Sequence, residues 1–350
     1  MKKNSSYLII SFIAGIFVFL FLIYSLTKQE KNGFVRNINN LETTFINEID
    51  LRSNEFYFHL NSPNLSFKSF KKSNFLLKLD NSLNKISNHI FTTPSKFKFS
   101  KTFNNLTSIG SSVFITNSKG MIIKYASDTV AGFYQIPNIT FNQGYAISNN
   151  SIVVRSTLKN GDIKQRELVK INFTDKATIE KRLLLPKQVD GFFCTDGWLT
   201  YDSKLKQLIY TYFYRGEILS LDTNLNVIYS AKTIDTVKQA KLKLLEQNNS
   251  LSSGSTIKRT SQTASNNMVN SFSTIGNNNI YILSALKADN DKTDFLKRKQ
   301  VVDVYDLRKG SYLYSFYLSR YNGYKPRDIK ITNNIISVLY DKYLVRYKIR

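Results

Sequence analysis

The hydrophobic positions of this 350-residue chain follow two distinct patterns. Residues 7–26 form a run of twenty positions without one charged side chain. A helix rises about 1.5 Å per residue, so this run would span ~30 Å, the thickness of the hydrocarbon core of a bilayer. From about residue 55 onwards, short segments alternate apolar and polar side chains, which is typical of β-strands. The pattern predicts one N-terminal transmembrane helix followed by an all-β domain.

We expect the apolar run to be a retained anchor at residues 7–27, behind a cytoplasmic tail at residues 1–6. A cleavable signal peptide is the alternative, but its apolar region usually has about 7–15 residues and ends at a small-x-small site. Lys2 and Lys3 favour a cytoplasmic N-terminus, although basic residues also follow the run. We therefore expect a single-pass protein of the cytoplasmic (inner) membrane. A stalk at residues 28–54 would carry the C-terminal domain in the extracytoplasmic or periplasmic space.

An internal repeat gives the architecture of that domain. Residues 77–86 (LKLDNSLNKI) and residues 219–228 (LSLDTNLNVI) are identical at six of ten positions, at an offset of 142 residues. Each copy predicts a strand, an Asp/Asn turn and a second strand, because Asp and Asn favour tight turns through hydrogen bonds to their own backbone.

Looser copies of this hairpin fill the rest of the chain, at Met121–Ile136, Leu168–Leu183 and Val301–Leu318. Corresponding positions lie 46, 46, 50, 84 and 42 residues apart, at Leu79, Tyr125, Ile171, Leu221, Tyr305 and Tyr347. A period near 45 residues with several short strands per unit is typical of β-propellers. The offset of 142 residues then corresponds to three blades.

A further strand precedes the hairpins after an Asn- or Gly-containing turn, as at Ser148–Val154 and Thr332–Val338. With these strands the chain resembles six-bladed propellers of the TolB-like and NHL-like type, best at Val304–Leu307 and Pro326–Ile331. The resemblance covers roughly residues 55–350 and implies an all-β, six-bladed β-propeller. The matching letters are structural, so the resemblance implies no activity. A β-sandwich or β-barrel is the alternative.

The interval of 84 residues locates a polar insertion at residues 233–267. Its first part, Val237–Gln247, predicts a short helix, and the Ser-, Thr- and Asn-rich remainder predicts a loop. A degraded seventh blade is the alternative for this insertion. Its polar composition also makes it the expected site of protease cleavage.

The last blade has three evident strands and needs a fourth, because an open edge strand is a liability. The segment Glu55–Leu60 is strand-like and has no hairpin partner of its own. We expect it to pair with Leu344–Ile349 and close the ring, with Thr44–Leu51 as the second choice.

The residue types that carry most chemistry are scarce. The chain has two histidines, His59 and His89, and one cysteine, Cys194, which we expect to be a buried thiol. A disulfide within the chain and a Cys-ligated zinc site are therefore excluded. We expect no catalytic residues, no metal site and no cofactor.

Two stretches of the fourth blade nevertheless carry side chains suited to ligands. Acidic residues and a tryptophan occur together where the blade begins, and acidic propeller loops can bind a cation or an amine: Asp190, Asp196, Trp198 and Asp202. An aromatic run ending in arginine follows, a composition found in interface hot spots and sugar-stacking sites: Tyr212, Tyr214 and Arg215. The structural alternative is that these residues cap turns and pack between blades.

The formal net charge of +24 has two interpretations. A basic field attracts anionic partners, but Lys, Asn, Ile, Phe and Tyr are all abundant, as A+T-rich coding would produce. The charge is also dispersed along the chain. We expect a non-enzymatic binding or scaffolding module for an envelope protein or glycan, and no nucleic-acid partner. The alternatives are a propeller hydrolase or lactonase, and a binder of an anionic polymer or lipid surface.

Overall fold

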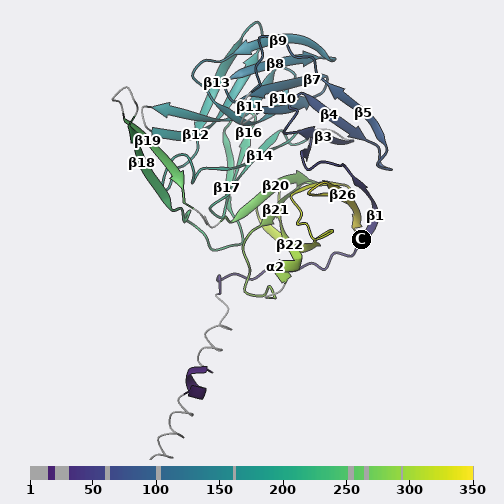
Figure 1. The fold of residues 1–350 in the computed structure, drawn as a ribbon, viewed down its shortest axis with the longest axis vertical. Coiled ribbons are helices and arrows are strands. Elements are labelled where there is room, and N and C mark those ends of the chain that lie inside the picture. The colour runs from purple at the N-terminus through teal and green to yellow at the C-terminus, as the bar shows by residue number, and fades with distance from the viewer. Residues whose placement is uncertain are drawn as a thin grey trace, which may run out of the picture.

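The computed structural model describes residues 15–19, 31–59, 64–99, 104–160, 163–250, 256–263, 268–292 and 295–349. Within these residues, six four-stranded antiparallel sheets follow one another in chain order around a common centre (Figure 1). The chain is therefore an all-β, six-bladed β-propeller, as the repeat period predicts.

The first three blades each use four consecutive strands, ordered from the centre outwards. They are β2 (Phe56–Phe58), β3 (Leu65–Ser69), β4 (Phe75–Leu79) and β5 (Lys85–Ile90) in blade 1; β6 (Asn104–Ile109), β7 (Ser112–Asn117), β8 (Met121–Ala126) and β9 (Thr129–Gln135) in blade 2; and β10 (Phe141–Ser148), β11 (Ser151–Asn160), β12 (Ile163–Phe173) and β13 (Ala177–Leu184) in blade 3.

The last three blades follow the same order, except that the outermost strand of the final blade comes from the N-terminal side. They are β14 (Gly197–Asp202), β15 (Gln207–Tyr212), β16 (Glu217–Asp222) and β17 (Val227–Lys232) in blade 4; β20 (Asn270–Gly276), β21 (Asn279–Ser284), β22 (Lys299–Asp306) and β23 (Tyr312–Ser319) in blade 5; and β24 (Asp328–Thr332), β25 (Ile335–Tyr340), β26 (Tyr343–Ile349) and β1 (Thr43–Asp50) in blade 6.

The core lies between the faces of neighbouring blades. Every residue of β15 is buried, whereas the outer strand β17 of the same blade alternates exposed and half-buried positions. Between blades 5 and 6, Val302 and Val304 share one apolar cluster with Ile336 and Val338. A central strand buried on both faces needs a continuous apolar run, so the middle strands gave the clearest sequence signal.

The repeated hairpins form as predicted, and their turns are built alike. Asp80 accepts hydrogen bonds from the backbone N–H groups of Ser82 and Asn84, both at 2.8 Å. Asp222 accepts the equivalent pair from Asn224 and Asn226, also at 2.8 Å. The two turns follow the third strands of blades 1 and 4, which confirms that the offset corresponds to three blades.

The ring is closed by an N-terminal strand, but not by the one favoured from sequence. β1 pairs antiparallel with β26 from Thr43↔Ile349 to Asp50↔Tyr343, so the second choice of closing strand is correct. The assignment of residues 55–60 is wrong, because β2 pairs with β3 and is the innermost strand of blade 1. The physical reason is burial: Phe56 and Phe58 are buried, as an inner strand requires, whereas most of β1 is exposed. The closing strand thus comes from within the predicted stalk.

The segment before β1 is fixed to blade 5 by a buried arginine. Arg36 donates from Nη1 to Asp291 at 2.5 Å and from Nε to Asp303 at 2.8 Å, and the three side chains are almost fully buried. Phe34 is buried beside them, and the Arg36 guanidinium lies 5.0 Å from the centroid of its ring. The chain is therefore held on blade 5 before it reaches blade 6.

The insertion after blade 4 is a hairpin. β18 (Leu244–Ser250) and β19 (Thr256–Gln262) pair only with each other and form a two-stranded sheet outside the blades (Figure 1). The helix predicted at residues 237–247 is wrong, since residues 237–243 are irregular and β18 begins at Leu244. The loop predicted for the remainder is wrong at Thr256–Gln262, which form β19. Of the apolar residues at 237–247 whose burial is described, only Ala240 is buried, and it packs in a small cluster with Cys194 and Tyr214.

The predicted anchor lies mostly outside the described residues. Of residues 7–27, only Gly15–Phe19 are described, and they are helical. Across the part of the chain that the structure describes, no helix combines the length and apolar composition needed to cross a membrane.

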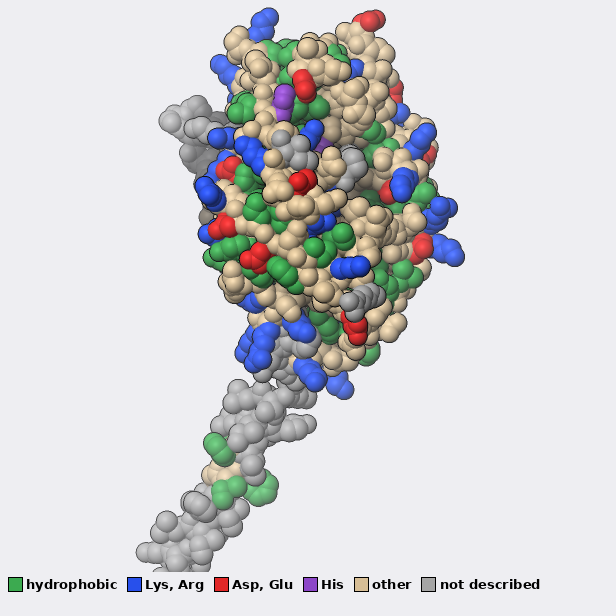
Figure 2. Space-filling model, turned by 90° about the vertical axis from the view of Figure 1, so that its right-hand side faces the viewer, with side chains coloured by type: hydrophobic (Ala, Val, Ile, Leu, Met, Phe, Trp, Pro, Cys, Tyr) green, Lys and Arg blue, Asp and Glu red, His purple; other side chains and the backbone are tan. Residues whose placement is uncertain are grey.

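Basic side chains are spread over the domain and gather at one end of it. Figure 2 shows Lys and Arg side chains scattered among acidic ones over most of this face, with a denser group beside the N-terminal segment. α2 (Phe295–Arg298) lies at the same end of the domain (Figure 1), and its Lys297 and Arg298 are exposed.

Candidate functional site: a cavity on the propeller axis

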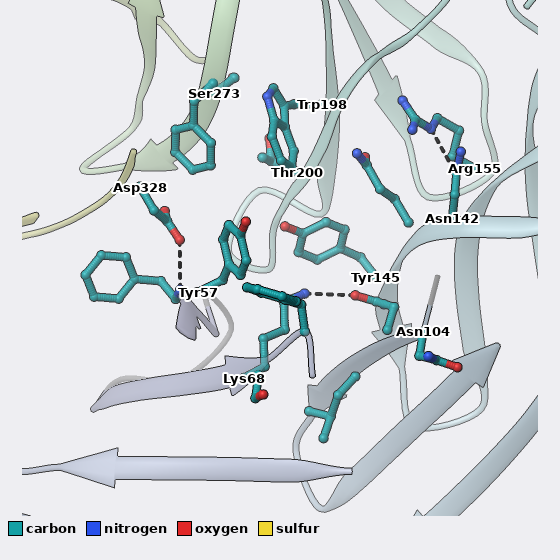
Figure 3. Close-up of a pocket in the computed structure, with 17 residues that line it drawn as sticks. Tyr57, Lys68, Asn104, Asn142, Tyr145, Arg155, Trp198, Thr200, Ser273 and Asp328 are labelled. Carbon is teal, nitrogen blue, oxygen red and sulfur yellow. Dashed lines mark hydrogen bonds between the residues drawn. The ribbon is translucent and has the colours of Figure 1, made fainter. Parts of the chain in front are cut away.

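A cavity of about 270 Å³ lies at the centre of the ring, where all six innermost strands contribute to its wall. One residue from each of these strands shows the arrangement (Figure 3): Tyr57 (β2), Asn104 (β6), Tyr145 (β10), Trp198 (β14), Ser273 (β20) and Asp328 (β24). Concave sites that combine aromatic walls with a few convergent polar groups are the usual form of a ligand site. The cavity is therefore the candidate site.

Asp328 is the acidic residue of this wall, at the first position of β24. It is 2% exposed, and its Oδ2 accepts the backbone N–H of Phe58 at 2.8 Å. Its Oδ1 is buried and has no hydrogen-bond partner within the described structure. Burial raises the pKa of this carboxyl from the usual 3.8 to about 7, against the lowering effect of the backbone N–H groups of Phe58 and Ile329 and of the charges of Arg327 and Lys68. The site thus holds a carboxyl oxygen that lacks a donor.

Lys68, in the middle of β3, brings an amine to the same cavity. Its Nζ donates to Asn105 Oδ1 at 2.8 Å rather than to the Asp328 carboxyl. Burial lowers its pKa from 10.5 to about 8, and the attraction of Asp328 only partly offsets this. An amine and a carboxyl therefore line one cavity, each held by a different neighbour (Figure 3).

Arg155, from β11, forms part of the wall through blade 3. Its Nε donates to Asn142 Oδ1 at 2.8 Å, and its Nη1 donates to Asp196 and to the Gly197 carbonyl oxygen. Burial would lower the pKa of Arg155, but the adjacent Tyr210 and Asp196 raise it. Its charge is thus balanced within the wall.

Trp198 supplies a fixed aromatic ring. Its Nε1 donates to the Ser271 carbonyl oxygen at 2.9 Å, and its ring meets those of Phe213 and Phe272 edge to face, with centroids 5.6 and 5.2 Å away. Tyr145, from the neighbouring inner strand β10, also lines the cavity (Figure 3), and burial raises the pKa of its hydroxyl.

The structure brings two of the acidic-cluster candidates to the cavity region. Trp198 lines the cavity, and Asp196 stands behind it as the partner of Arg155. Asp190 instead accepts backbone N–H groups of its own turn, including that of Cys194 at 2.7 Å. Asp202, at the far end of β14, accepts the Leu205 N–H at 2.7 Å. These two residues cap turns and do not line the cavity.

The aromatic candidates form a separate packed group. Tyr212 is buried, and the Arg215 guanidinium lies 3.6 Å from the centroid of its ring. Arg215 is itself buried and pairs with Glu217 at 2.9 Å through Nε. Tyr214 is also buried, beside Cys194 and Ala240, and Cys194 is the buried thiol expected from sequence. None of these residues lines the axial cavity.

Sequence reasoning missed Asp328, Lys68, Tyr57 and Tyr145. Asp328 falls in the blade segment Pro326–Ile331, where it matches a blade consensus letter, so the resemblance implies only a structural role for it. The available signal was a charged residue within a short strand of alternating apolar and polar residues, as in β3 (LSFKS) and β24 (DIKIT).

The two histidines lie beside a second cavity, on blades 1 and 2. His59 is buried, its Nε2 lies 3.2 Å from Ser108 Oγ, and burial lowers its pKa to about 3. His89 Nε2 lies 3.8 Å from Asp128. No group of three or more His, Cys, Asp or Glu side chains placed to hold a metal ion occurs within the described ranges.

No protein-family model matches the chain, and no curated protein matches its sequence. Solved structures match its fold. A member of the DUF4221 family from Bacteroides vulgatus superposes with a TM-score of 0.57 at 11% identity, over 89% of this chain and 98% of that one. The β-propeller domain of Cps50 from Myceliophteria thermophila gives a TM-score of 0.45 at 9% identity, over 88% and 100% of the two chains. BamB from Moraxella catarrhalis gives 0.41 at 12% identity, over 84% and 81%. At such identities the likeness to the DUF4221 structure shows the fold alone, and that fold is the six-bladed β-propeller.

Proposed function

We propose that this protein is a non-enzymatic binding module of the cell envelope, which holds a small polar group of a protein or glycan partner in its axial cavity. The observation that carries the proposal is the cavity wall itself. All six inner strands build one concave site, and a buried carboxyl oxygen in it lacks a donor. A buried polar atom without a partner costs about 1–3 kcal/mol, so a ligand that donates to Asp328 would regain part of that free energy.

The proposal includes the membrane anchor at residues 7–27 and an extracytoplasmic domain. The described part of that segment supports it, since helical residues Phe17, Val18 and Phe19 are 70%, 59% and 63% exposed. Apolar helical side chains that project away from the protein are matched by lipid. The resemblance to TolB-like and NHL-like propellers belongs to the same proposal, as a statement about the type of blade.

In-cell photocrosslinking tests the proposed function. A benzophenone amino acid replaces Phe70, which lines the cavity and is 52% exposed, in the full-length chain. The matched control places it at Val130 on the outer strand β9, which is 45% exposed. We expect a discrete adduct from position 70 that is absent from position 130 and is reduced by Asp328→Asn. Equal adducts from both positions, or none from position 70, would contradict the proposal.

A further inference from the structure

The ligand class can be narrowed from the pairing of Asp328 and Lys68, on the basis that the proposed binding function holds. Asp328 Oδ1 needs a donor. Lys68 gives one N–H to Asn105 at 2.8 Å, and an ammonium carries three. When the amine is protonated and the carboxyl ionised, a ligand group between them must accept from the first and donate to the second.

Charged ligands fit this pairing poorly. A cationic ligand would meet Lys68, and an anionic one would meet Asp328, in a site where burial already disfavours both charges. The carboxyl has a pKa of about 7 and the amine a pKa of about 8, so both protonation states of each are accessible near neutral pH. A hydroxyl both donates and accepts, so it pairs with every one of these states. The polar contacts therefore favour an uncharged polyhydroxyl ligand.

The aromatic residues add a requirement of shape. Trp198 is held in place by Ser271 and by the edges of Phe213 and Phe272, so its ring is fixed before any ligand arrives. Tyr57, from blade 1, and Tyr145, from the blade next to that of Trp198, add two further rings to the wall (Figure 3). The volume, about 270 Å³, lies just below the roughly 300–1,000 Å³ of sites for drug-sized ligands. Such a space accepts one ring with an apolar face.

A ring with one apolar C–H face and a rim of hydroxyls is a pyranose. We propose that the axial cavity binds a single uncharged pyranose unit, either free or at the end of a glycan. Two ring hydroxyls bridge Asp328 and Lys68, and the C–H face lies against Trp198.

Saturation-transfer NMR on the purified full-length chain tests this assignment. The probes are D-glucose, D-galactose, D-mannose and N-acetyl-D-glucosamine, with choline, glycine and citrate as charged probes. We expect transfer to at least one sugar and to none of the charged probes. Affinity for that sugar should fall about ten-fold in Asp328→Asn and in Lys68→Met, the loss expected for one hydrogen bond to a charged group.

Tyr145→Phe removes only a hydroxyl, so it should fold and remain informative even if the other two cavity variants misfold. The folding of every variant is checked by its melting curve. Asp175→Asn and Lys176→Met, in the exposed β12–β13 turn, are the matched controls and should bind as the parent does. Sugar binding that survives all three cavity variants would place the sugar elsewhere and overturn the inference. Binding of a charged probe that Asp328→Asn abolishes would overturn the pyranose assignment while leaving the binding function intact. Failure of every probe also overturns it, and the photocrosslink at position 70 then decides the binding function separately.

Discussion

The residue with the most unusual environment is Asp328, a carboxyl in a cavity wall with one satisfied and one unsatisfied oxygen. In the folded protein its pKa is about 7, whereas in the unfolded chain it should return to about 3.9. Between these values the folded state binds a proton that the unfolded state has released. Its contribution to stability is therefore greatest at low pH and is lost as pH rises towards 7.

Asp328→Asn should remove this pH dependence. Relative to the parent, the variant should gain on the order of 2 kcal/mol of unfolding free energy on going from pH 5 to pH 8. Urea unfolding of both proteins at the two pH values measures the difference. If the difference in unfolding free energy between variant and parent is the same at pH 5 and pH 8, the carboxyl is ionised in the folded protein throughout this range.

The two Asp turns show how far short-range chemistry determines the blades. Leu83 and Leu225 occupy the left-handed region, with φ of 67° and 59°, yet both are buried. The Asp side chain fixes each turn by accepting two backbone N–H groups, and the buried leucine offsets the backbone strain.

Asp222→Ala should cost about 1 kcal/mol of stability, because two N–H groups lose a charged acceptor. Asp80→Ala should cost a similar amount in the equivalent turn of blade 1. Urea denaturation measures both, with Asp175→Ala in an exposed turn as the control. A negligible cost at both repeat positions would mean that the strands, and not the aspartates, define these turns.

At the scale of elements, residues 31–50 are attached to the blade 5 region by several contacts, of which the Arg36 site is the buried one, and to blade 6 by the β1–β26 ladder. Arg36 satisfies two buried aspartates at once. Removal of one partner from such a buried group leaves charges uncompensated, at a cost of about 3–5 kcal/mol.

Arg36→Met should therefore be strongly destabilising, by about 3–5 kcal/mol. Arg308→Met, in the exposed turn after β22, is the matched control and should be neutral. Adding Asp291→Asn and Asp303→Asn to Arg36→Met should recover part of the loss. Coincident urea midpoints for the two arginine variants would refute a structural role for the buried cluster.

The sequence correctly predicted the strands that pair with a neighbour in the chain. The prediction of strand pairing failed where the partner is distant in the sequence. Hairpins such as β22–β23 are encoded by their own turn residues, so repeat and turn signals located them. β1 pairs with residues about 300 positions away, and its exposed faces gave it little apolar periodicity. The prediction of the candidate site from sequence failed for the same reason. Lys68 and Asp328 belong to separate blades, and only ring closure brings them to one cavity.

At the scale of the whole molecule, basic side chains are scattered over the face seen in Figure 2, with a denser group at the end of the domain where α2 lies (Figures 1 and 2). If this end binds an anionic surface, binding of the full-length chain to vesicles with acidic lipids should weaken severalfold between low and physiological salt, since exposed charges are screened beyond about 8–10 Å. Charge reversal at Lys297, Arg298 and Lys299 should weaken it further. If the binding does not depend on salt concentration, the +24 charge is better explained by the amino-acid bias of A+T-rich coding.

Because the blade 5 contacts at Arg36 and at residues 37–39 precede β1 in the chain, we expect their order to govern how the domain responds to force. A pull on the chain before Asn32 should first load the contacts with the blade 5 region, which are the Asn32–Asp289 hydrogen bond and then the buried Arg36–Asp291–Asp303 cluster. Only after that cluster yields does the load reach the β1–β26 ladder, whose separation would open the ring. The contacts with blade 5 should therefore bear the load before the β1–β26 ladder in blade 6 does. A moderate force on the N-terminus should leave that ladder paired and the ring closed.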